Sequence, residues 1–378
     1  MPRSRWLARL VALLAGAGVV TVVPAWWCGR RADAFFDGDL GAQRALASGV
    51  REWLERDPAT LTFGTGSPRF DGEWYLITHV AAAIGLAQTA LEHPELGSEH
   101  ARLVERAIDR ALLPRGRAHD ALAWSEDPLE ALDGDRGHLA FLGYANLALS
   151  MHRRLEPRSR FSRLNDEITA ALARRFARHG SGALLESYPA ETYPADNAAA
   201  IASIALHDRA AGGQNSDVVQ DVLSAFSTRY RDPRSGFLYQ RVDSETGAPR
   251  DAARASGTAL AAFVLGAAGL DAARPLWRSL ARQFDDVLGF GGVREYGPGD
   301  GAGDVDSGPV IFGLGVSASG FALAAARRHG DRERFRGLFA SAWLFGLPYE
   351  TKAGLRFVSG GAVGDTLLFA LLTAGRAR

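Results

Sequence analysis

The chain has 378 residues, 47% of them hydrophobic and 23% charged, and its 43 basic residues balance its 43 acidic ones. This composition is typical of a globular protein and excludes wholesale disorder, and the lack of a basic tract argues against nucleic acid as a partner. Cys28 is the single cysteine, so residues 29–378 contain no disulfide, zinc–thiolate site or cysteine nucleophile. The single lysine, Lys352, follows Thr351 rather than glycine, which excludes a Walker A loop.

Residues 1–28 have the pattern of either a signal peptide or an N-terminal membrane anchor. The charged start consists of Arg3, Arg5 and Arg9. The uncharged stretch 10–27 follows, with small residues for signal cleavage at 23–25 and 18 residues in all, just enough to span a bilayer. Lipidation of Cys28 is a third option, disfavoured by the bulky tryptophans before it. The pattern predicts an exported protein, periplasmic or membrane-anchored and facing outward.

From residue 41 onward, Ala- and Gly-rich helices are expected to alternate with amphipathic, Arg-rich ones. The small-residue helices are expected at 72–92, 137–154, 194–211, 253–270, 307–329 and 361–376, and the amphipathic ones at 41–57, 98–113, 158–178, 214–230, 272–287 and 331–346. In 98–113, Leu103 and Ile108 fall on one face and Arg102 and Asp109 on the other, which is typical of a helix with one solvent-facing side. The Ala- and Gly-rich helices lack a wide polar face, so they should be buried on both sides.

Six two-sided helices inside six one-sided helices predict an all-α (α/α)6 toroid, with residues 29–378 forming one domain. An open α-solenoid is the alternative. In a toroid the inner helices run the same way, so their N-terminal ends line one mouth. Strand-like pieces at 236–242 and 354–358 predict short β-hairpin loops at that mouth.

The segments before the inner helices concentrate carboxylates and aromatic side chains. The candidate catalytic carboxylates are Glu73, Glu191, Asp196, Asp304 and Asp306, and the candidate substrate-binding aromatics are Trp74, Trp124, Tyr188, Tyr193, Tyr239 and Tyr296. Carboxylates serve as general acids and bases once burial or like charge moves a pKa toward neutrality. Aromatic rings provide flat apolar platforms for a sugar or an isoprenoid-like chain. Glu73, Asp196 and Asp306 come from alternate inner helices, so we expect them to face one another across the mouth.

Structural roles compete with these functional ones. Asp71, Asp196 and Ser307 stand where helix N-caps are expected. Asp300, Asp304 and Asp306 lie in a glycine-rich loop that resembles a calcium site, although their spacing is not that of an EF-hand; no other cofactor is expected. Among the histidines, His79 is expected in the core, His138 near the mouth, and His100 and His119 in solvent.

Several segments resemble the linalool dehydratase/isomerase family, whose fold is an (α/α)6 barrel. These segments are 143–147, 196–198, 207–209, 232–239, 245–247 and 304–330. The resemblance implies a shared scaffold and pocket location. The family's active-site histidine falls on Tyr144, which becomes a further candidate pocket residue, and its two pocket cysteines fall near Ser187 and on Asp196; an acidic group in the Asp304/Asp306 region is kept.

These replacements shift the expected chemistry from thiols to carboxylates and leave three functions open. The first is a lyase or isomerase acting on a hydroxylated, partly apolar substrate. The second is a carbohydrate-active enzyme, either a hydrolase or an epimerase/lyase, acting on a glycan. The third is a non-catalytic scaffold of the cell envelope.

Overall fold

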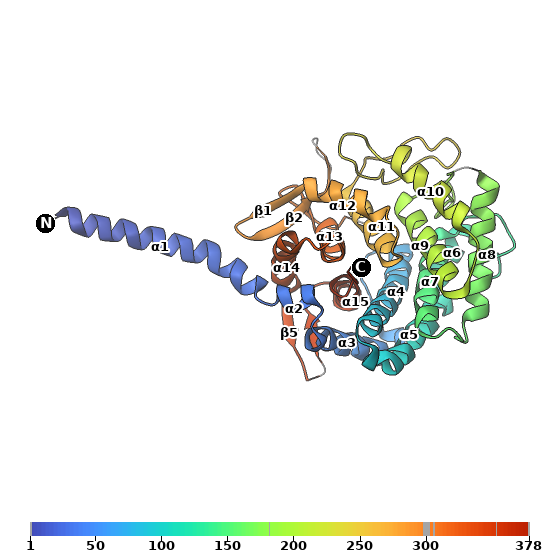
Figure 1. The fold of residues 1–378 in the computed structure, drawn as a ribbon, viewed down its shortest axis with the longest axis horizontal. Helices are drawn as coiled ribbons and strands as arrows, with labels where there is room; N and C mark the ends of the chain where they lie inside the picture. Colours follow the sequence, from blue (N-terminus) through green and yellow to red (C-terminus); the bar gives the residue numbers. More distant parts are fainter. Residues whose placement is uncertain (1, 181, 298–302, 305–306, 353, 377–378) are drawn as a thin grey trace.

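Twelve helices form two concentric rings in the computed structural model, which describes residues 2–180, 182–297, 303–304, 307–352 and 354–376 (Figure 1). The inner ring contains α4 (Pro68–Glu92), α7 (Leu139–Leu155), α9 (Pro194–Ala211), α11 (Ala255–Ala267), α13 (Val316–Arg328) and α15 (Gly361–Leu372). The outer ring contains α3 (Leu40–Glu55), α5 (Gly97–Ala111), α8 (Ser162–His179), α10 (Ser216–Thr228), α12 (Ala273–Arg282) and α14 (Arg332–Gly346). Each inner helix packs against the next, and α15 packs against α4. The (α/α)6 toroid is therefore confirmed, and the open solenoid is wrong.

Small residues allow the inner helices to approach closely. Gly143 of α7 faces α9 so closely that a Cβ atom there would lie 3.3 Å from the backbone nitrogen of Ala200. Gly85 of α4 leaves room for the ring of Phe369 on α15, where a Cβ atom would lie 2.5 Å from Cδ1. The second contact is the one that closes the ring.

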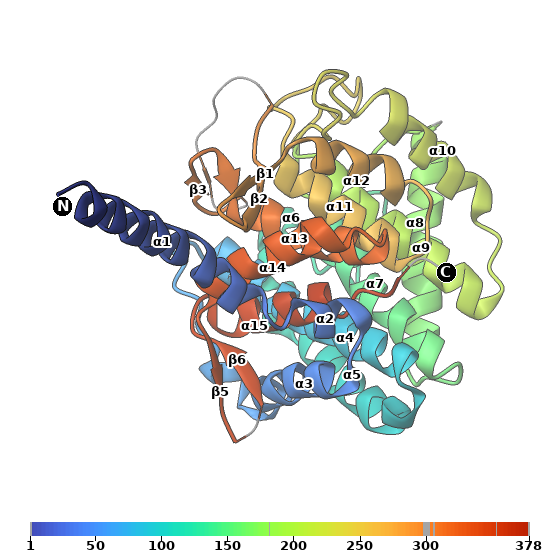
Figure 2. The same ribbon diagram turned by 60° about the vertical axis from the view of Figure 1, so that its left-hand side comes forward.

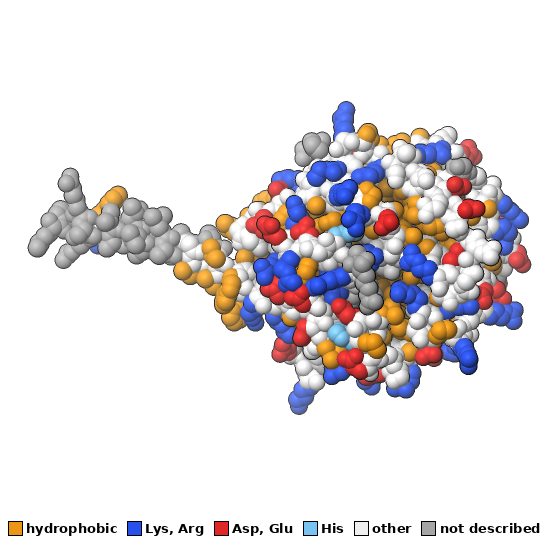
Figure 3. Space-filling model, in the orientation of Figure 1, with side chains coloured by type: hydrophobic (Ala, Val, Ile, Leu, Met, Phe, Trp, Pro, Cys, Tyr) orange, Lys and Arg blue, Asp and Glu red, His pale blue; other side chains and the backbone are white. Residues whose placement is uncertain are grey.

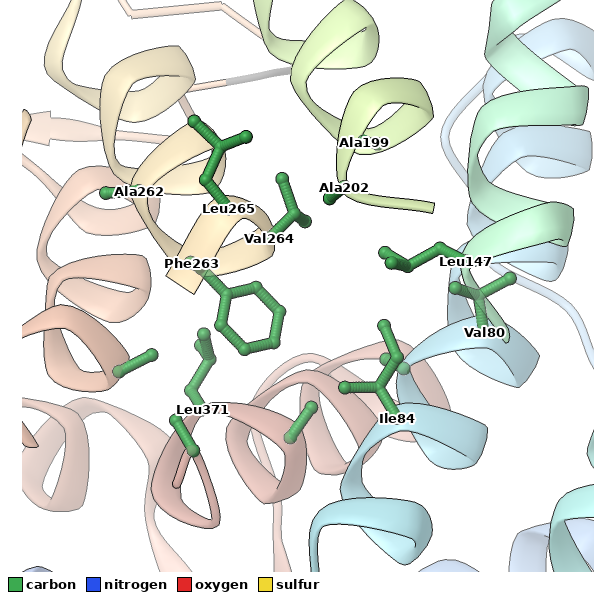
Figure 4. Packing of buried hydrophobic residues seen from close by; sticks show 14 of the residues in the cluster. Val80, Ile84, Leu147, Ala199, Ala202, Ala262, Phe263, Val264, Leu265 and Leu371 are labelled. Atoms are coloured by element: carbon green, nitrogen blue, oxygen red, sulfur yellow. The ribbon is translucent and has the colours of Figure 1, made fainter. Parts of the chain in front are cut away.

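The centre of the ring is filled by side chains rather than open. Figure 4 shows Val80 and Ile84 from α4, Leu147 from α7, and Phe263 and Val264 from α11 pointing toward one another, and all of them are buried. The outer helices add one apolar face each, as in α5, where the buried residues repeat at helical spacing. The barrel core is a packed interior, so a ligand site is expected at an end of the barrel.

Buried polar groups also join the two rings. Asn146 of α7 donates to Thr169 of α8 at 3.0 Å and to Ser203 of α9 at 2.9 Å. Asn165 of α8 donates to Asn146 Oδ1 at 2.7 Å and to Ser150 at 3.0 Å. Such buried hydrogen bonds fix the orientation of the helices because an unpaired buried amide is costly.

Short sheets lie at the end of the barrel where the inner helices begin. β1 (Phe284–Val287), β2 (Phe290–Arg294), β3 (Val310–Ile311) and β4 (Leu314–Gly315) form an antiparallel sheet in the order β1-β2-β4-β3, and β5 (Pro348–Glu350) pairs with β6 (Leu355–Phe357). The strand expected at 354–358 is confirmed, whereas 236–242 makes only isolated bridges. The helices expected at 272–287 and 307–329 are shorter than predicted, because β1 takes the end of one and the β3–β4 hairpin the start of the other.

Three further helices lie outside the two rings: α1 (Pro2–Gly29), α2 (Ala32–Asp37) and α6 (Pro114–Trp124). Helix α1 projects away from the barrel, and α14 is the helix on which its end packs (Figures 1 and 2). Among the described residues, one helix, α4, is long and apolar enough to cross a membrane, but 83% of its apolar window is buried inside the barrel. Helix α4 is therefore a core helix.

Ring closure can be tested at Gly85. Gly85→Ala places a methyl group against the Phe369 ring and should lower the free energy of unfolding by about 1–3 kcal/mol, the usual cost of overpacking. Urea denaturation followed by circular dichroism measures this change. Gly320→Ala is the matched control, because Gly320 also lies within an inner helix but has no atom within 4 Å of its missing Cβ. The control should gain up to about 1 kcal/mol, and equal stability of the two variants would contradict the packing assigned to Gly85.

Candidate active site

Asp196 lies in the first turn of α9 and joins two other mouth residues. Helix α9 begins at Pro194, whose fixed φ suits a first helical position. Tyr144 of α7 donates a 2.7 Å hydrogen bond to Asp196 Oδ1, and the Ser187 hydroxyl interacts with the same carboxyl group. Tyr144 and Ser187 are buried, while Asp196 keeps partial solvent exposure. The three positions to which the family resemblance pointed thus meet in one group.

Burial raises the pKa of Asp196, and the hydrogen bonds from Ser187 and Tyr144 and the charge of Arg69 offset only part of that effect. A carboxyl group with a raised pKa keeps its proton at pH values where an ordinary aspartate is ionised. This protonation state is the one required of a general acid.

Arg69, in the first turn of α4, gathers two carboxylates and an aromatic ring beside Asp196. Its Nη2 donates to Glu191 Oε2 at 2.6 Å, and its Nε lies 3.7 Å from Glu73 Oε1. Its guanidinium lies 3.5 Å from the ring centroid of Tyr188, whose hydroxyl donates to Glu73. Tyr193 donates to Glu191 at 2.9 Å. One cation therefore holds together side chains from two distant segments of the chain.

The pKa values in this group are shifted in opposite directions. Hydrogen bonds from Arg69 and Tyr193 outweigh burial and lower the pKa of Glu191, so it is ionised at neutral pH. Burial and then the negative charge of Glu73 raise the pKa of Tyr188, which therefore remains a hydrogen-bond donor. A carboxyl group of raised pKa beside one of lowered pKa is the pairing from which acid and base roles arise in acid–base catalysis.

A second polar group surrounds Glu295, which follows strand β2. The backbone N–H and the hydroxyl of Ser256 donate to Glu295 Oε1 at 3.2 and 2.5 Å. Burial raises the pKa of Glu295 to about 7, against the lowering effects of Ser256 and Arg254. Arg254 donates to Asp304 and lies 5.6 Å from the ring centroid of Tyr296. Hydrogen bonds from Arg254 and Ser307 outweigh burial and lower the pKa of Asp304.

His138 supports the first group from below the mouth loops. Its Nδ1 lies 2.6 Å from Asp120 Oδ1, and its Nε2 lies 3.2 Å from Glu126 Oε1. Its ring contacts that of Trp124 in a tilted arrangement with 4.8 Å between centroids, and Trp124 donates to the Ser187 carbonyl at 3.3 Å. Burial raises the pKa of Asp120, while the hydrogen bond from His138 opposes this effect. This arrangement holds the loop that carries Ser187 and Tyr188.

The structure brings together most of the residues predicted from the sequence. The first group contains Glu73, Tyr144, Tyr188, Glu191, Tyr193 and Asp196, with Trp124 adjoining it; the second contains Asp304 and Tyr296. Trp74 packs edge-on against Phe63 with 6.3 Å between centroids, and Tyr239 packs against the core, so neither is placed in these groups.

The expectations for Asp300 and Asp306 fall outside the described residues. Of the three carboxylates predicted to face one another, Glu73 and Asp196 are described and Asp306 is not. Glu73 and Asp196 both lie near Tyr188, because the charge of each raises the pKa of Tyr188. Within the described ranges, no three His, Cys, Asp or Glu side chains are grouped as metal ligands. Asp304, part of the suggested calcium loop, is engaged by Arg254.

The N-cap predictions are wrong. Tyr193 is the N-cap of α9, Ser67 that of α4 and Gly315 that of α13. Asp71 instead accepts hydrogen bonds from the backbone and hydroxyl of Thr65 at 3.0 and 2.7 Å. Asp196 is thus free of a capping role.

Sequence reasoning missed Arg69 and Arg254, the two cations that organise the mouth. Arg69 stands four residues before Glu73, and this spacing, typical of a helical ion pair, is the signal that could have identified it. His119 was also misplaced: it is buried, and burial together with the nearby Arg69 charge lowers its pKa to about 4, against one backbone hydrogen bond. Helix α6 can pack this closely against α4 because residue 72 is glycine. A Cβ atom at Gly72 would lie 2.7 Å from the His119 Cβ. His100 is likewise buried, whereas His79 lies in the core as predicted.

A cavity of about 440 Å³ lies at the opposite end of the barrel, where α13 ends. Its lining includes Arg274, Arg278, Arg328 and Arg376. Arg328 donates to the Gly375 carbonyl, and cations at helix C-terminal ends are stabilised by the exposed carbonyl groups. Arg328 thus joins the end of α13 to the segment that follows α15.

The fold is shared with solved structures of sugar-active enzymes. An inactive variant of the α-1,6-mannanase GH76A of Salegentibacter sp. HEL1_6, in complex with α-1,6-mannotriose, has a TM-score of 0.54 and 12% identity, covering 89% of this chain and 99% of that chain. An unsaturated glucuronyl hydrolase specific for heparin has a TM-score of 0.52 and 11% identity over 89% and 96% of the two chains. A D-mannose isomerase has a TM-score of 0.50 and 13% identity over 79% and 86%.

At these identities the likeness shows the fold alone. No curated protein matches the chain. The family model described as linalool dehydratase/isomerase matches residues 145–361, more than half of the sequence, and this span contains Ser187, Asp196 and Glu295. The chain therefore belongs to the linalool dehydratase/isomerase family.

Proposed function

We propose that the protein is an exported, membrane-anchored enzyme of the lyase or isomerase type, which acts on a hydroxylated, partly apolar small molecule. The observation that carries this proposal is the hydrogen bond from Tyr144 to Asp196, beside which the buried Ser187 lies. The sequence resemblance implies that the family's active-site histidine falls on Tyr144 and its cysteines near Ser187 and on Asp196. The group also combines a carboxyl group of raised pKa, Asp196, with one of lowered pKa, Glu191.

The proposed reaction begins with proton transfer from Asp196 to the substrate hydroxyl. The C–O bond breaks, water leaves, and the electron pair of a neighbouring C–H bond forms the double bond while Glu73 accepts the proton. Transfer of that proton back to Asp196 through solvent restores the enzyme, so the net change is loss of one water molecule. Return of water at another carbon of an allylic cation would give the isomerised alcohol instead.

Arg69 and Tyr188 keep the two carboxyl groups in their roles. The Tyr188 hydroxyl donates to Glu73, and Arg69 lies beside the same carboxylate, so its ionised form is the one supported. Because these contacts stabilise the Glu73 carboxylate, it is a weak base. It accepts the proton of the neighbouring C–H bond only as positive charge develops on the substrate and makes that proton acidic.

A glycan substrate is the second candidate. Solved structures that share this fold include proteins named as a mannanase, a glucuronyl hydrolase and a mannose isomerase. Glycoside hydrolases also need one protonated and one ionised carboxyl group. A screen of the purified protein against a panel of alcohols and a panel of glycans decides between the two classes. A protein that turns over no compound in either panel would be a scaffold.

Helix α1 supports anchoring over cleavage. The helix runs unbroken through the cleavage signal at 23–25. Ala25 packs closely against Gly289, where a Cβ atom added to the glycine would lie 2.7 Å from the Ala25 Cβ. Cys28 belongs to the barrel's apolar core. Side chains further out, such as Val20 and Val22, are exposed and need a partner. The uncharged stretch 10–27 is about 27 Å long at 1.5 Å per residue, close to the bilayer core.

Asp196→Asn should lower kcat on the identified substrate by about 10²–10⁴, because a positioned proton donor contributes that much. In the wild type, kcat should fall as pH rises through the raised pKa of Asp196, and this limb should vanish in the variant. The purified protein is assayed by mass spectrometry against panels of alcohols and glycans. Asp71→Asn is the matched control, since Asp71 bonds only to the Thr65 loop in the hydrogen bonds of the structure. A folded Asp196→Asn protein with near-normal turnover would refute the assignment.

Glu295 should make stability fall as pH rises from about 4.5 to about 7. Its pKa is about 7 in the folded protein, and an unfolded glutamate titrates near 4.3, so the folded state binds the extra proton in this window. The loss amounts to at most a few kcal/mol, at about 1.4 kcal/mol per unit. Glu295→Gln should flatten this dependence in urea denaturation at pH 5, 6 and 8. Identical pH profiles for wild type and variant would show that Glu295 titrates normally.

Retention of α1 predicts a membrane-bound protein of full length. After expression, the protein should resist extraction by carbonate at pH 11, and the intact mass should include residues 1–25. Arg3, Arg5 and Arg9 favour a cytoplasmic N-terminus, so a reporter fused after residue 378 should be active outside the cytoplasm. A shorter mass with release into the soluble fraction would instead establish cleavage.

A further inference from the structure

Most of the large exposed apolar side chains on the barrel come from one stretch of the chain. Outside α1, twelve large hydrophobic residues are exposed among the described residues, and all but Leu113 and Leu122 lie between Val287 and Val358. Within that stretch the most exposed are Phe312 at 94%, Val358 at 63% and Leu288 at 61%. Such clustering marks an interaction surface, since scattered single residues are the ordinary case.

This region surrounds the base of α1. The turn after β1 contacts α1, because Gly289 lies against Ala25, and α14 packs along the end of α1. On the other side, Arg31 pairs with Glu350 of β5 at 2.9 Å. Figure 2 shows these strands on the side of the barrel from which α1 projects, and Figure 3 shows hydrophobic side chains gathered where the two meet.

We propose that these side chains form an apolar collar that rests on the lipid bilayer crossed by α1. The collar consists of Val287, Leu288, Phe312, Phe345, Leu347 and Val358. The proposal rests on the anchoring described above and adds that the catalytic domain itself touches lipid. It is therefore held on the membrane surface at a set orientation and does not swing on a tether.

The level of the collar along α1 matches the water–lipid boundary. Leu288 is the neighbour of Gly289, which contacts Ala25, and exposed Trp26 and Trp27 follow directly. Tryptophans at the end of a spanning helix lie at the headgroup level, where a ring with one polar group is stable. Leu288 therefore lies close to this level, and we expect the apolar tips of the collar to enter the outer part of the same leaflet.

The shape of the collar also fits a bilayer. Phe312 stands on the two-residue turn between β3 and β4, and Leu288 on the turn between β1 and β2, so these are protruding tips. Val358 donates its N–H to the Leu347 carbonyl, which makes the β6 end continuous with the end of α14. A second protein docking here would have to make room for α1, which emerges between these tips, whereas fluid lipid packs around both.

Docking in this way has a consequence for substrate access. Strand β4 leads directly into α13, and β6 leads to α15, so the collar's hairpins border the end of the barrel where the inner helices begin. That edge of the mouth would lie beside lipid. The substrate class that fits is an amphipathic alcohol that partitions into the bilayer.

The test uses the full chain and its lack of other thiols. In a Cys28→Ala background, single cysteines are introduced as Leu288→Cys, Phe345→Cys or Phe312→Cys and spin-labelled. Leu13→Cys in α1 reports on anchoring, and Arg163→Cys, whose parent side chain is 91% exposed on the outer helix α8, is the water-facing control. Each protein is reconstituted into phosphatidylcholine–phosphatidylglycerol vesicles, its fold is checked by thermal melting, and collisions with oxygen and with a soluble nickel chelate are measured.

The measured quantity is the ratio of oxygen collisions to nickel-chelate collisions at each label. For labels on the collar and for the Leu13→Cys label, this ratio should be severalfold higher than for the Arg163→Cys label. If the collar labels match the Arg163→Cys label while the Leu13→Cys label lies in lipid, the anchor stands and the docking proposal fails. If the Leu13→Cys label is also water-exposed, both proposals fail. Collar labels shielded from both reagents, with dipolar broadening between chains, would show a protein–protein interface and overturn the proposal. A label that unfolds the protein is replaced by one at Val358→Cys.

Discussion

Close contact between small-residue helices is the constraint on which this structure depends. Six pairs of helices could also stack in an open row. The approach of α15 to α4, across Gly85 and Phe369, turns the row into a ring. Closure then fills the middle with side chains from most inner helices (Figure 4). The interior of the barrel is thereby filled with packed side chains, so a ligand site is expected only at one of its ends.

Closure also sets where the polar groups go. Because every inner helix starts at the same end, the segments that precede them converge there, and residues far apart in sequence become neighbours. Arg69 and Glu191 pair in this way across 122 positions. The helices that crowd this end remove water from Asp196 and Glu295, and that removal shifts their pKa values upward. The acid–base character of the site is thus a product of burial more than of residue identity.

The same end of the barrel faces the apolar collar, so two properties of the chain are coupled. The hairpins that carry the collar are the connections into α13 and α15, and they hold the start of those helices in place. The exposed apolar side chains of the collar and the start of two inner helices at the mouth therefore share structural elements. The chain thus has the scaffold of the linalool dehydratase/isomerase family, with Tyr144, Asp196 and Ser187 brought together at the mouth of the barrel.

The sequence by itself determined the six helical pairs, the apolar N-terminus and the concentration of carboxylates before the inner helices, because helical periodicity and composition are local properties. It also pointed to Tyr144, Ser187 and Asp196 through family resemblance. Only the tertiary structure decided that Arg69 organises the mouth, that His119 is buried, that Asp196 caps no helix, and that Trp74 and Tyr239 stand apart. Which partner a side chain meets, and how much water it loses, depends on contacts between segments that no local pattern encodes.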